Sequence, residues 1–303
     1  MNSNNILNNV ISIDHQKCTG CQRCIPVCPV DNIIIKQKKA LPVNESCLLC
    51  DHCAATCPEG AIDNPKADDS TLMFNSFELK REWMPPGQFD PAQLAHLMYS
   101  RRSCRNFGPK ELCAEQLDDL IKFGISAPSG TNSQLWTFTL LNTREKVVAL
   151  AEVVLAYYQK LNKLAANTLL RKSLSVIGNR ELEIYFRDYH ESVEDAISRW
   201  KGQQEDLLFH GAPAVIVVGN KTHASCPRED PLLATQNILL GAHSLGLGSC
   251  LIGFVVEAAK RDKSIAGHLK IPSDERIYSV IALGYSQERY SGLPRRNKPL
   301  IRR

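Results

Sequence analysis

The hydrophobic and polar positions follow one pattern at the start of the chain and another over the rest. Residues 10–13, 30–35 and 61–62 are short apolar stretches that precede or follow segments dense in cysteine. From residue 90 onward, apolar positions recur at the spacing of helices and strands. The two patterns predict a small N-terminal domain and a second, larger one.

A stretch without periodicity separates the two patterns, from residue 64 to residue 89. It is rich in Asn, Asp, Pro and Gly, which predicts an extended linker. It also contains Phe74, Phe77 and Trp83. Because such rings gain most from burial, the linker is predicted to lie against a surface.

Capping signals and apolar spacing predict the helices of the larger domain. One helix begins at Asp90-Pro91, since Asp is a good N-cap and Pro suits the first helical position. A second fits residues 114–126, residues 144–208 are mostly helical, and residues 232–245 form a long buried helix.

Apolar runs of strand length predict a sheet between these helices. The runs cover residues 137–141, 212–218 and 277–283, and the middle one is continuous enough for a central strand. Helices on both faces of a sheet give an α+β or three-layer architecture. The predicted organisation is a first domain over residues 1–64, a linker over 65–88 and a second domain over 89–303.

Composition fits this two-domain prediction and limits the function classes. The chain has 303 residues, with 44% apolar and 22% charged residues and a net charge of +4, which does not suggest a nucleic-acid partner. Residues 1–5 are polar and lack the features of a secretory signal. The most apolar stretch, residues 238–256, is interrupted by polar residues and glycines and predicts a buried helix and strand, not a membrane span. A cytoplasmic protein is expected.

Eight of the twelve cysteines fall in two copies of one motif. Residues 18–29 and 47–58 both read C-x2-C-x2-C-x3-C-P, and such a repeat predicts a pseudo-symmetric fold. Three thiolates on one tight loop reach three corners of a cubane cluster, whereas the fourth ligates the other cluster. The predicted ligands are Cys18, Cys21, Cys24 and Cys57 for one [4Fe–4S] cluster, and Cys47, Cys50, Cys53 and Cys28 for the other.

Zinc sites and disulfides are the alternative interpretations of these cysteines. Structural zinc needs four ligands and no third cysteine at this spacing, so the complete pattern favours clusters. Residues 10–63 resemble the 2[4Fe–4S] ferredoxin family. That resemblance implies a β-α-β-β-α-β fold and one-electron transfer at low potential.

Two polar motifs stand out in the larger domain. The first motif concentrates guanidinium groups that can bind phosphate, although a basic helix end can also be a solvated face. It reads Arg101-Arg102-Ser103-Cys104-Arg105-Asn106-Phe107. The second motif brings together amide and hydroxyl donors that can bind a ribityl chain or a flavin ring edge. It reads Ala127-Pro128-Ser129-Gly130-Thr131-Asn132-Ser133-Gln134-Leu135-Trp136. An ordinary loop before a strand is the alternative for the second motif.

In this order, the two motifs resemble those of the nitroreductase family. Residues 211–217, 234–240, 245–250 and 282–285 resemble its central strand, its long helix, the following turn and its last core strand, so the resemblance covers residues 89–303. It implies a three-layer α/β/α domain with a mainly antiparallel central sheet, and hence an α+β chain overall. It also implies FMN at the interface of an interlocked homodimer.

The resemblance assigns roles to individual residues. The FMN phosphate and the pyrimidine side of the ring would be bound by Arg101, Arg102, Ser103 and Arg105, and one or both of Arg295 and Arg296 would close on the phosphate. The partner subunit would contribute Pro128, Ser129, Gly130, Asn132 and Gln134. Backbone N–H groups of Ile252 and Gly253 would lie near the flavin N5. Many relatives carry an acidic residue where this chain has Ile252.

The predicted function is that of an iron–sulfur flavoprotein oxidoreductase. Electrons would pass between two [4Fe–4S] clusters and FMN, which would reduce a small organic acceptor such as a nitroaromatic, a quinone or an activated alkene. Reduced ferredoxin, another low-potential protein or NAD(P)H would be the donor. The alternatives are an electron carrier or redox sensor that serves a separate enzyme, and a structural cysteine-rich module on an inactive fold. No catalytic side chain is assigned, because the cofactor carries the chemistry in such enzymes.

Overall fold

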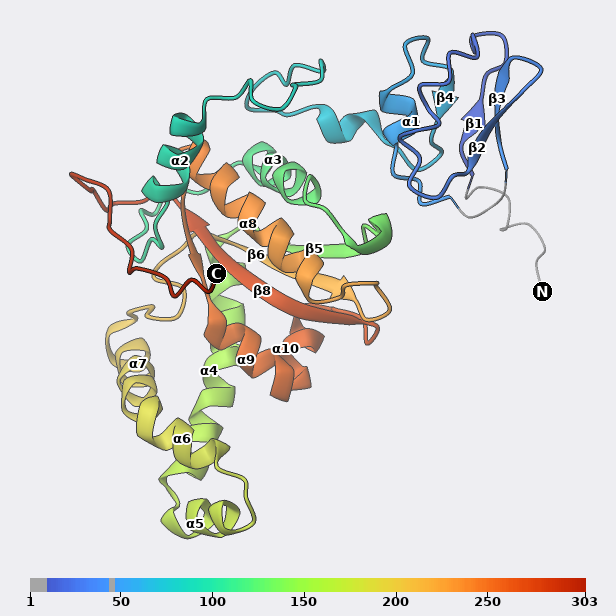
Figure 1. The fold of residues 1–303 in the computed structure, drawn as a ribbon. Helices are drawn as coiled ribbons and strands as arrows, with labels where there is room; N and C mark the ends of the chain where they lie inside the picture. The colour runs from blue at the N-terminus through green and yellow to red at the C-terminus, as the bar shows by residue number, and fades with distance from the viewer. Residues whose placement is uncertain (1–9, 44–46) are drawn as a thin grey trace. The chain divides into compact units, whose positions relative to one another are not determined.

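The computed structural model describes residues 10–43 and 47–303, which separate into two compact units (Figure 1). The first unit combines Met1–Met73 with the short segment Ser129–Gln134, and the second combines Phe74–Pro128 with Leu135–Arg303. The boundary at Met73 falls inside the linker predicted from the sequence. The return of residues 129–134 to the first unit is a feature that no local pattern predicts.

The described part of the first unit is built from two antiparallel strand pairs and one short helix. Its strands pair β1 (Ser12–Ile13) with β4 (Ile62–Asp63) and β2 (Ile33–Lys36) with β3 (Lys39–Pro42), and its helix is α1 (His52–Ala55). A 3-10 turn, η1 (Asp69–Leu72), and a second, η2 (Gly130–Asn132), complete it.

The expected β-α-β-β-α-β order is wrong in its first helix. Residues 22–28 form two successive turns, in which the Ile25 N–H donates to Gln22 O and the Cys28 N–H to Ile25 O, both at 3.1 Å. Gln22 also adopts a left-handed backbone (φ 67°), which interrupts a right-handed helix at this point.

The second unit contains a four-stranded sheet in the order β5-β6-β8-β7 with every pair antiparallel. Its strands are β5 (Trp136–Leu141), β6 (Ala214–Lys221), β7 (Gly248–Leu251) and β8 (Glu275–Gly284). Its helices are α2 (Pro91–Ser100), α3 (Ala114–Ile125), α4 (Arg144–Ala166), α5 (Thr168–Val176), α6 (Glu181–Asp188), α7 (His190–Gln203), α8 (Glu229–Ser244), α9 (Gly253–Arg261) and α10 (Lys263–His268).

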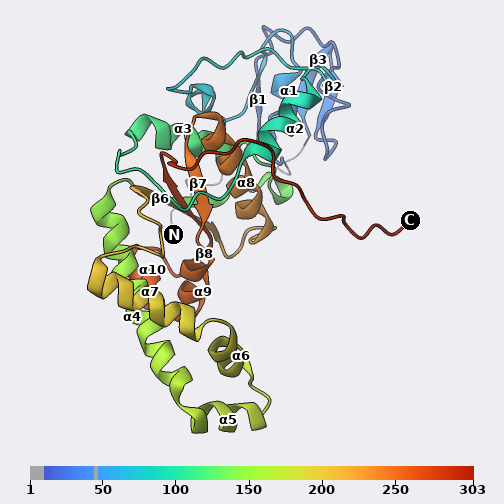
Figure 2. The same ribbon diagram turned by 90° about the vertical axis from the view of Figure 1, so that its left-hand side faces the viewer.

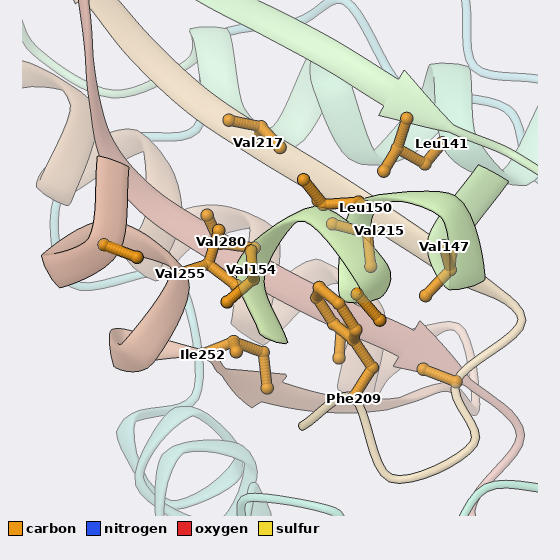
Figure 3. Close-up of a cluster of buried hydrophobic side chains, with 14 of the residues drawn as sticks. Leu141, Val147, Leu150, Val154, Phe209, Val215, Val217, Ile252, Val255 and Val280 are labelled. Carbon is orange, nitrogen blue, oxygen red and sulfur yellow. The ribbon is translucent and has the colours of Figure 1, made fainter. Parts of the chain in front are cut away.

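Alternating side chains of the central strands build a core on each face of this sheet. On β6, Val215 and Val217 join the cluster formed with α4, α7, α9 and α10, whereas Ile216 and Val218 join the cluster formed with α3 and α8. Figure 3 shows the first cluster, in which Leu150 and Phe209 lie beside the sheet. These layers confirm the predicted α+β class, with helices on both faces of an antiparallel sheet.

The helical region predicted over residues 144–208 resolves into α4 to α7. The far end of α4 extends away from the sheet and carries α5 and α6 with it (Figure 2). Buried Asn162 joins three of these helices, because its Nδ2 donates to His190 O (3.2 Å) and to Glu194 Oε2 (2.8 Å) and its Oδ1 accepts from Tyr185 Oη (2.5 Å). Among the described residues, no helix combines the length and apolar character needed to cross a bilayer.

The start of the second unit is the part of the predicted linker that lies against a surface. Phe74 stacks on Phe77, with 4.6 Å between ring centroids, and contacts Phe123 of α3 at 5.1 Å. Beside these rings, the buried Asp119 carboxylate accepts the backbone N–H groups of Asn75 and Ser76, each at 2.7 Å. The prediction is therefore confirmed for Phe74 and Phe77 but wrong for Trp83, which is 82% exposed.

Candidate functional site

The first candidate site is a cavity in the N-terminal unit. Its lining includes the four cysteines predicted to bind one cluster: Cys18, Cys21, Cys24 and Cys57. Gly20 shapes the loop between the first two cysteines, because its φ is +69° and a Cβ there would lie 2.1 Å from Lys38 O. The close approach of the β2–β3 turn thus requires glycine.

A second cavity in the same unit is lined by the complementary set: Cys28, Cys47, Cys50 and Cys53. Each cavity therefore takes three cysteines from one copy of the motif and the fourth from the other copy, as the spacing predicts. Cys53 lies on α1, whereas Cys57 follows that helix and lines the first cavity.

Backbone N–H groups point at the sulfur atoms in both cavities. In the first, Ala40 N donates to Cys18 Sγ (3.4 Å) and Ala61 N to Cys57 Sγ (3.3 Å). In the second, Asn32 N donates to Cys28 Sγ (3.2 Å) and Leu49 N to Cys47 Sγ (3.4 Å). Such donors stabilise negative charge on sulfur, which suits thiolate ligands.

The buried cysteines are poor acids when no metal is bound. Burial raises the pKa of the Cys24 thiol and raises that of Cys53 to about 11, and the neighbouring cysteines of each cavity add to both shifts. A metal that binds thiolates must therefore displace protons, so that binding couples to pH and to folding.

The geometry of the cavities fits a multi-atom cluster better than a single ion. All twelve cysteines are free of disulfides. Over residues 10–43 and 47–303, no group of three or more His, Cys, Asp or Glu side chains is spaced closely enough to share one metal ion. Four thiols around one cavity match the donor set of a [4Fe–4S] cluster.

A cationic cluster in the second unit is the candidate anion site. Arg101 follows the last residue of α2, and its pKa is lowered first by burial and then by the positive charges of Arg102 and Arg296. The side chain of Arg296, far away in sequence, thus lies near the arginine motif. None of these three arginines forms an ion pair within the described part of the chain. Uncompensated positive charge of this kind favours a phosphate ligand.

The rest of the arginine motif is fixed to the edge of the sheet. Ser103 forms a parallel bridge with Ser249 of β7, and Cys104 N donates to Ser249 O at 2.9 Å. The Ser249 hydroxyl is buried and has no hydrogen-bond partner among the described residues. The Arg105 N–H donates to Glu288 Oε1 at 2.8 Å, which leaves its exposed guanidinium available. An orphaned hydroxyl beside a cation cluster fits a polar ligand such as FMN.

The two residues predicted near the flavin N5 differ in the availability of their backbone N–H groups. Ile252 is only 4% exposed, lies in the core cluster of Figure 3, and donates its N–H to Val280 O at 2.8 Å. Gly253 is the first residue of α9, where N–H groups have no intrahelical acceptor. Of this pair, Gly253 therefore has the more available backbone donor.

Arg295 is exposed, and Pro128 ends the first segment of the second unit.

Four other predicted flavin residues belong to the first unit instead: Ser129, Gly130, Asn132 and Gln134. Ser129 Oγ accepts the Gln134 N–H at 3.1 Å, and Gln134 Nε2 donates to Asn132 Oδ1 at 3.0 Å. Asn132 Nδ2 donates to two carbonyl groups of the loop between Cys47 and Cys50. Their contribution to the flavin site of the partner subunit stays a prediction.

Some residues of these sites were missed at the sequence level. Lys39 Nζ donates to Cys18 O at 2.5 Å and Asn64 Nδ2 to Leu49 O at 3.1 Å, so both side chains support the cysteine loops. His243, whose pKa is lowered by burial and then by Arg101, lies beside the cationic cluster. No motif marks these residues, because their roles depend on contacts made by the folded chain.

Comparison with known families identifies both parts of the chain. A family model described as the nitroreductase family matches residues 98–285, which is more than half of the chain. The chain belongs to the nitroreductase family. A second model, described as a 4Fe-4S dicluster domain, matches residues 10–67. The predictions of a nitroreductase-type domain and of a ferredoxin-type 4Fe-4S module are thereby confirmed.

Two known proteins share a moderate level of sequence identity with this chain. One, from Archaeoglobus fulgidus, is 26% identical over 192 residues, which cover 63% of this chain and 84% of that protein, and its name places it among the NADH dehydrogenase/NAD(P)H nitroreductases. Another, from Nocardioides, is named 4-nitrobenzoate reductase and is 26% identical over 208 residues, 64% of this chain and 81% of that protein.

Solved structures resemble the nitroreductase part of the chain. A nitroreductase with bound FMN from Bacteroides fragilis has 21% identity and a TM-score of 0.47, and the match covers 69% of this chain and 95% of that one. A nitroreductase with bound FMN from Desulfitobacterium hafniense has 22% identity and a TM-score of 0.48, with coverage of 67% and 93%.

Proposed function

We propose that this nitroreductase is an iron–sulfur flavoprotein in which electrons pass between two [4Fe–4S] clusters and FMN and then reduce a small organic acceptor. The observation that carries the proposal is the sorting of eight cysteines into two cavities of four, in one chain with a nitroreductase domain. FMN, when bound, supplies the exchange between single electrons and electron pairs.

The chain's own residues would hold these groups in two sites. Each cavity supplies four thiolates and two N–H···S hydrogen bonds. At the anion site, Arg101, Arg102 and Arg105 would bind the FMN phosphate together with Arg296 or Arg295, and Ser103 would add a hydroxyl. The Gly253 N–H would lie near N5. We further propose a homodimer in which the partner subunit completes the FMN site.

The donor and the acceptor follow from the proposed groups and from the relatives. Low-potential clusters suit reduced ferredoxin or a similar protein donor. The names of the Archaeoglobus and Nocardioides proteins refer to NAD(P)H and to 4-nitrobenzoate, and they support NAD(P)H as a second donor and nitroaromatics as acceptors, beside quinones and activated alkenes. Cysteines free of disulfides support a cytoplasmic location.

An anaerobic absorbance titration tests the proposal. The purified chain receives NADH, then NADPH, then reduced ferredoxin, and afterwards 4-nitrobenzoate. We expect flavin and cluster absorbance to bleach with at least one donor and to recover when the acceptor is added. Protein without iron, sulfide or flavin would refute the proposal. Protein that bleaches but does not recover with any small acceptor would instead be an electron carrier.

Variants then assign the direction of electron flow. In Cys53→Ser, one cavity loses a buried ligand, whereas Cys226→Ser alters a cysteine outside both cavities and is the matched control. If the clusters deliver electrons to FMN, Cys53→Ser loses reduction by ferredoxin and keeps any reduction by NAD(P)H. If electrons run the other way, NAD(P)H still reduces the flavin but no longer the altered cluster.

A further inference from the structure

The two cavities of the first unit differ in how close their cysteines come to the surface. Cys21, in the first cavity, is exposed, whereas the other seven predicted ligands are buried or half-buried. Electron transfer between two proteins slows steeply as the distance between their redox groups grows. An external partner would therefore exchange electrons fastest at the first cavity, where a ligand sulfur reaches the surface.

The turn between β2 and β3 lies directly against the first cysteine loop. The approach leaves no room for a side chain at Gly20, where a Cβ would lie 2.1 Å from Lys38 O. From the same turn, Lys39 Nζ donates to Cys18 O. Three of the four residues 36–39 are lysines, so the turn concentrates positive charge beside this loop.

The loop itself adds a further cation, Arg23, which lines the first cavity. Arg23, Lys36 and Lys38 are exposed, and none of them forms an ion pair within the described part of the chain. Among the described residues that line this cavity, Glu59 is the only carboxylate. The exposed Cys21 is therefore bordered by positive charge that the described residues leave largely uncompensated.

The second cavity has no comparable charge. Its described lining contains one carboxylate, Asp51, and neither lysine nor arginine. Its loop between Cys47 and Cys50 accepts hydrogen bonds from Asn132, which belongs to the segment that the family resemblance places at the flavin site of the partner subunit. The second cavity is thus the one bordered by a predicted flavin segment, which leaves the first for an external partner.

We propose that the basic rim of the first cavity is the docking surface for an acidic, low-potential electron-transfer protein. The basic rim consists of Arg23, Lys36, Lys38 and Lys39 and surrounds Cys21. The proposal rests on the proposed function, which places a cluster in this cavity. Each encounter transfers one electron from the reduced partner to that cluster, with no bond made or broken and no proton moved. Two encounters supply the electron pair that FMN needs.

The charges of the rim suit such a partner. Electron-transfer complexes are small and short-lived, so a few charges around the point of transfer are enough to orient the encounter. Opposite charge on the two surfaces raises the rate of association and makes it sensitive to salt. An acidic partner is the one that four cations with a single facing carboxylate would attract.

The first test measures binding, separately from turnover. The probe is an oxidised 2[4Fe–4S] ferredoxin of net negative charge, titrated anaerobically into the full-length holoprotein in a calorimeter. Lys36→Glu/Lys38→Glu reverses two charges of the basic rim. We expect this variant to raise Kd by roughly tenfold or more at low ionic strength, and we expect added salt to remove most of the difference.

The matched control is Lys263→Glu/Lys270→Glu, which makes the same change of charge in the second unit. Both lysines are exposed, and Lys270 has a left-handed backbone (φ 55°) like that of Lys38 (φ 63°). The control should bind the ferredoxin as the wild type does. Iron and FMN per chain should equal those of the wild type in both variants.

The second test compares two electron donors of opposite charge. Stopped-flow absorbance follows the reduction of the clusters by the same ferredoxin and by the methyl viologen cation radical. Reversal of the rim charges should slow the reaction with ferredoxin and accelerate the reaction with methyl viologen, because attraction and repulsion exchange places. Rising salt should slow the reduction of the wild type by ferredoxin.

Three results would overturn the proposal. The rim variant and the control could have the same Kd for ferredoxin, the rim variant could change both donor reactions in the same direction at wild-type iron content, or it could dissociate the homodimer in sedimentation, which would make the rim a subunit contact. If the rim variant loses iron, the salt series of the wild type decides, and a rate independent of ionic strength would count against the proposal. Wild-type protein without clusters would refute the proposed function itself, a separate outcome.

Discussion

The two units of the chain differ in what fills their cores. In the first unit, Cys18, Cys24 and Cys53 are core residues alongside six aliphatic side chains. In the second, two aliphatic and aromatic clusters pack on opposite faces of one sheet. A small core seldom stabilises a domain of this size, so we expect the first unit to depend on what its cysteines bind and the second to depend mainly on the burial of its two apolar clusters.

The largest expected effect follows from this difference. Removal of iron by oxidation and a chelator should unfold the first unit and leave the second folded, because only the first has its metal ligands in its core. Hydrogen exchange followed by mass spectrometry measures both units at once. Loss of protection in β2 and β3 with full protection in β6 and β8 is expected, and equal loss in both would contradict the comparison.

A core truncation should produce the reverse pattern. Phe209 is fully buried beside Leu150 (Figure 3), so Phe209→Ala should destabilise the second unit by about 3–5 kcal/mol. Thermal unfolding followed by far-UV circular dichroism measures this loss. The iron content per chain should not change, and Phe89→Ala, at a half-exposed ring, is the control with little effect.

The anion site gives the next largest effect. Each charged hydrogen bond that is lost costs about 1.5–3 kcal/mol, so Arg101→Ala/Arg105→Ala should weaken FMN binding by roughly 100-fold or more. Flavin per chain after gel filtration gives the result, with iron per chain as the internal reference. The control Arg199→Ala removes an arginine already paired with Asp195 and Glu205. Unchanged flavin content in the double variant would show that the motif does not bind the phosphate.

The smallest effect concerns the contact that joins the linker to α3. Burial acts to raise the pKa of Asp119, but hydrogen bonds from Asn75 and Ser76 outweigh it and hold the pKa below the ordinary 3.8. The ionised Asp119 carboxylate thus adds about 1–3 kcal/mol to the free energy of unfolding. This contribution is present above pH 3.8 and is lost as the pH falls below that value. Asp119→Asn should remove this acid dependence. Protease cleavage near residue 74, measured against pH for both proteins, tests the prediction, and identical profiles would contradict it.

Local signals predicted much of the fold and of the cysteine sites. Cysteine spacing was enough to sort the eight thiols between two cavities, and Asp90-Pro91 marked the start of α2, where Asp90 accepts the Ala92 N–H. The continuous apolar run of β6 marked the central strand. The helix start and the strand depend on residues close together in sequence, whereas the sharing of Cys28 and Cys57 between the repeats follows from the recognised cysteine pattern.

Features that depend on distant contacts could not be derived in this way. The approach of Arg296 to Arg101 was expected only from the family resemblance, and the hydrogen bonds from Asn132 to the Leu48 and Leu49 carbonyl groups were not expected. The left-handed backbone of Leu49 shows the reason, because nothing in the leucine side chain favours it and only the contacts of the folded loop select it. The missing first helix of the ferredoxin-type module has a similar cause at Gln22.

The exchange of Cys28 and Cys57 between the two repeats has a consequence for how the protein would acquire the proposed clusters. A fragment that contained either repeat alone would present three thiols and an open fourth corner, since the missing sulfur is encoded in the other half. During synthesis the second site cannot be completed before Cys53 is added, nor the first before Cys57. Insertion of the proposed clusters would therefore wait for both repeats, and a chain interrupted between them would offer only three of the four thiols of the first site.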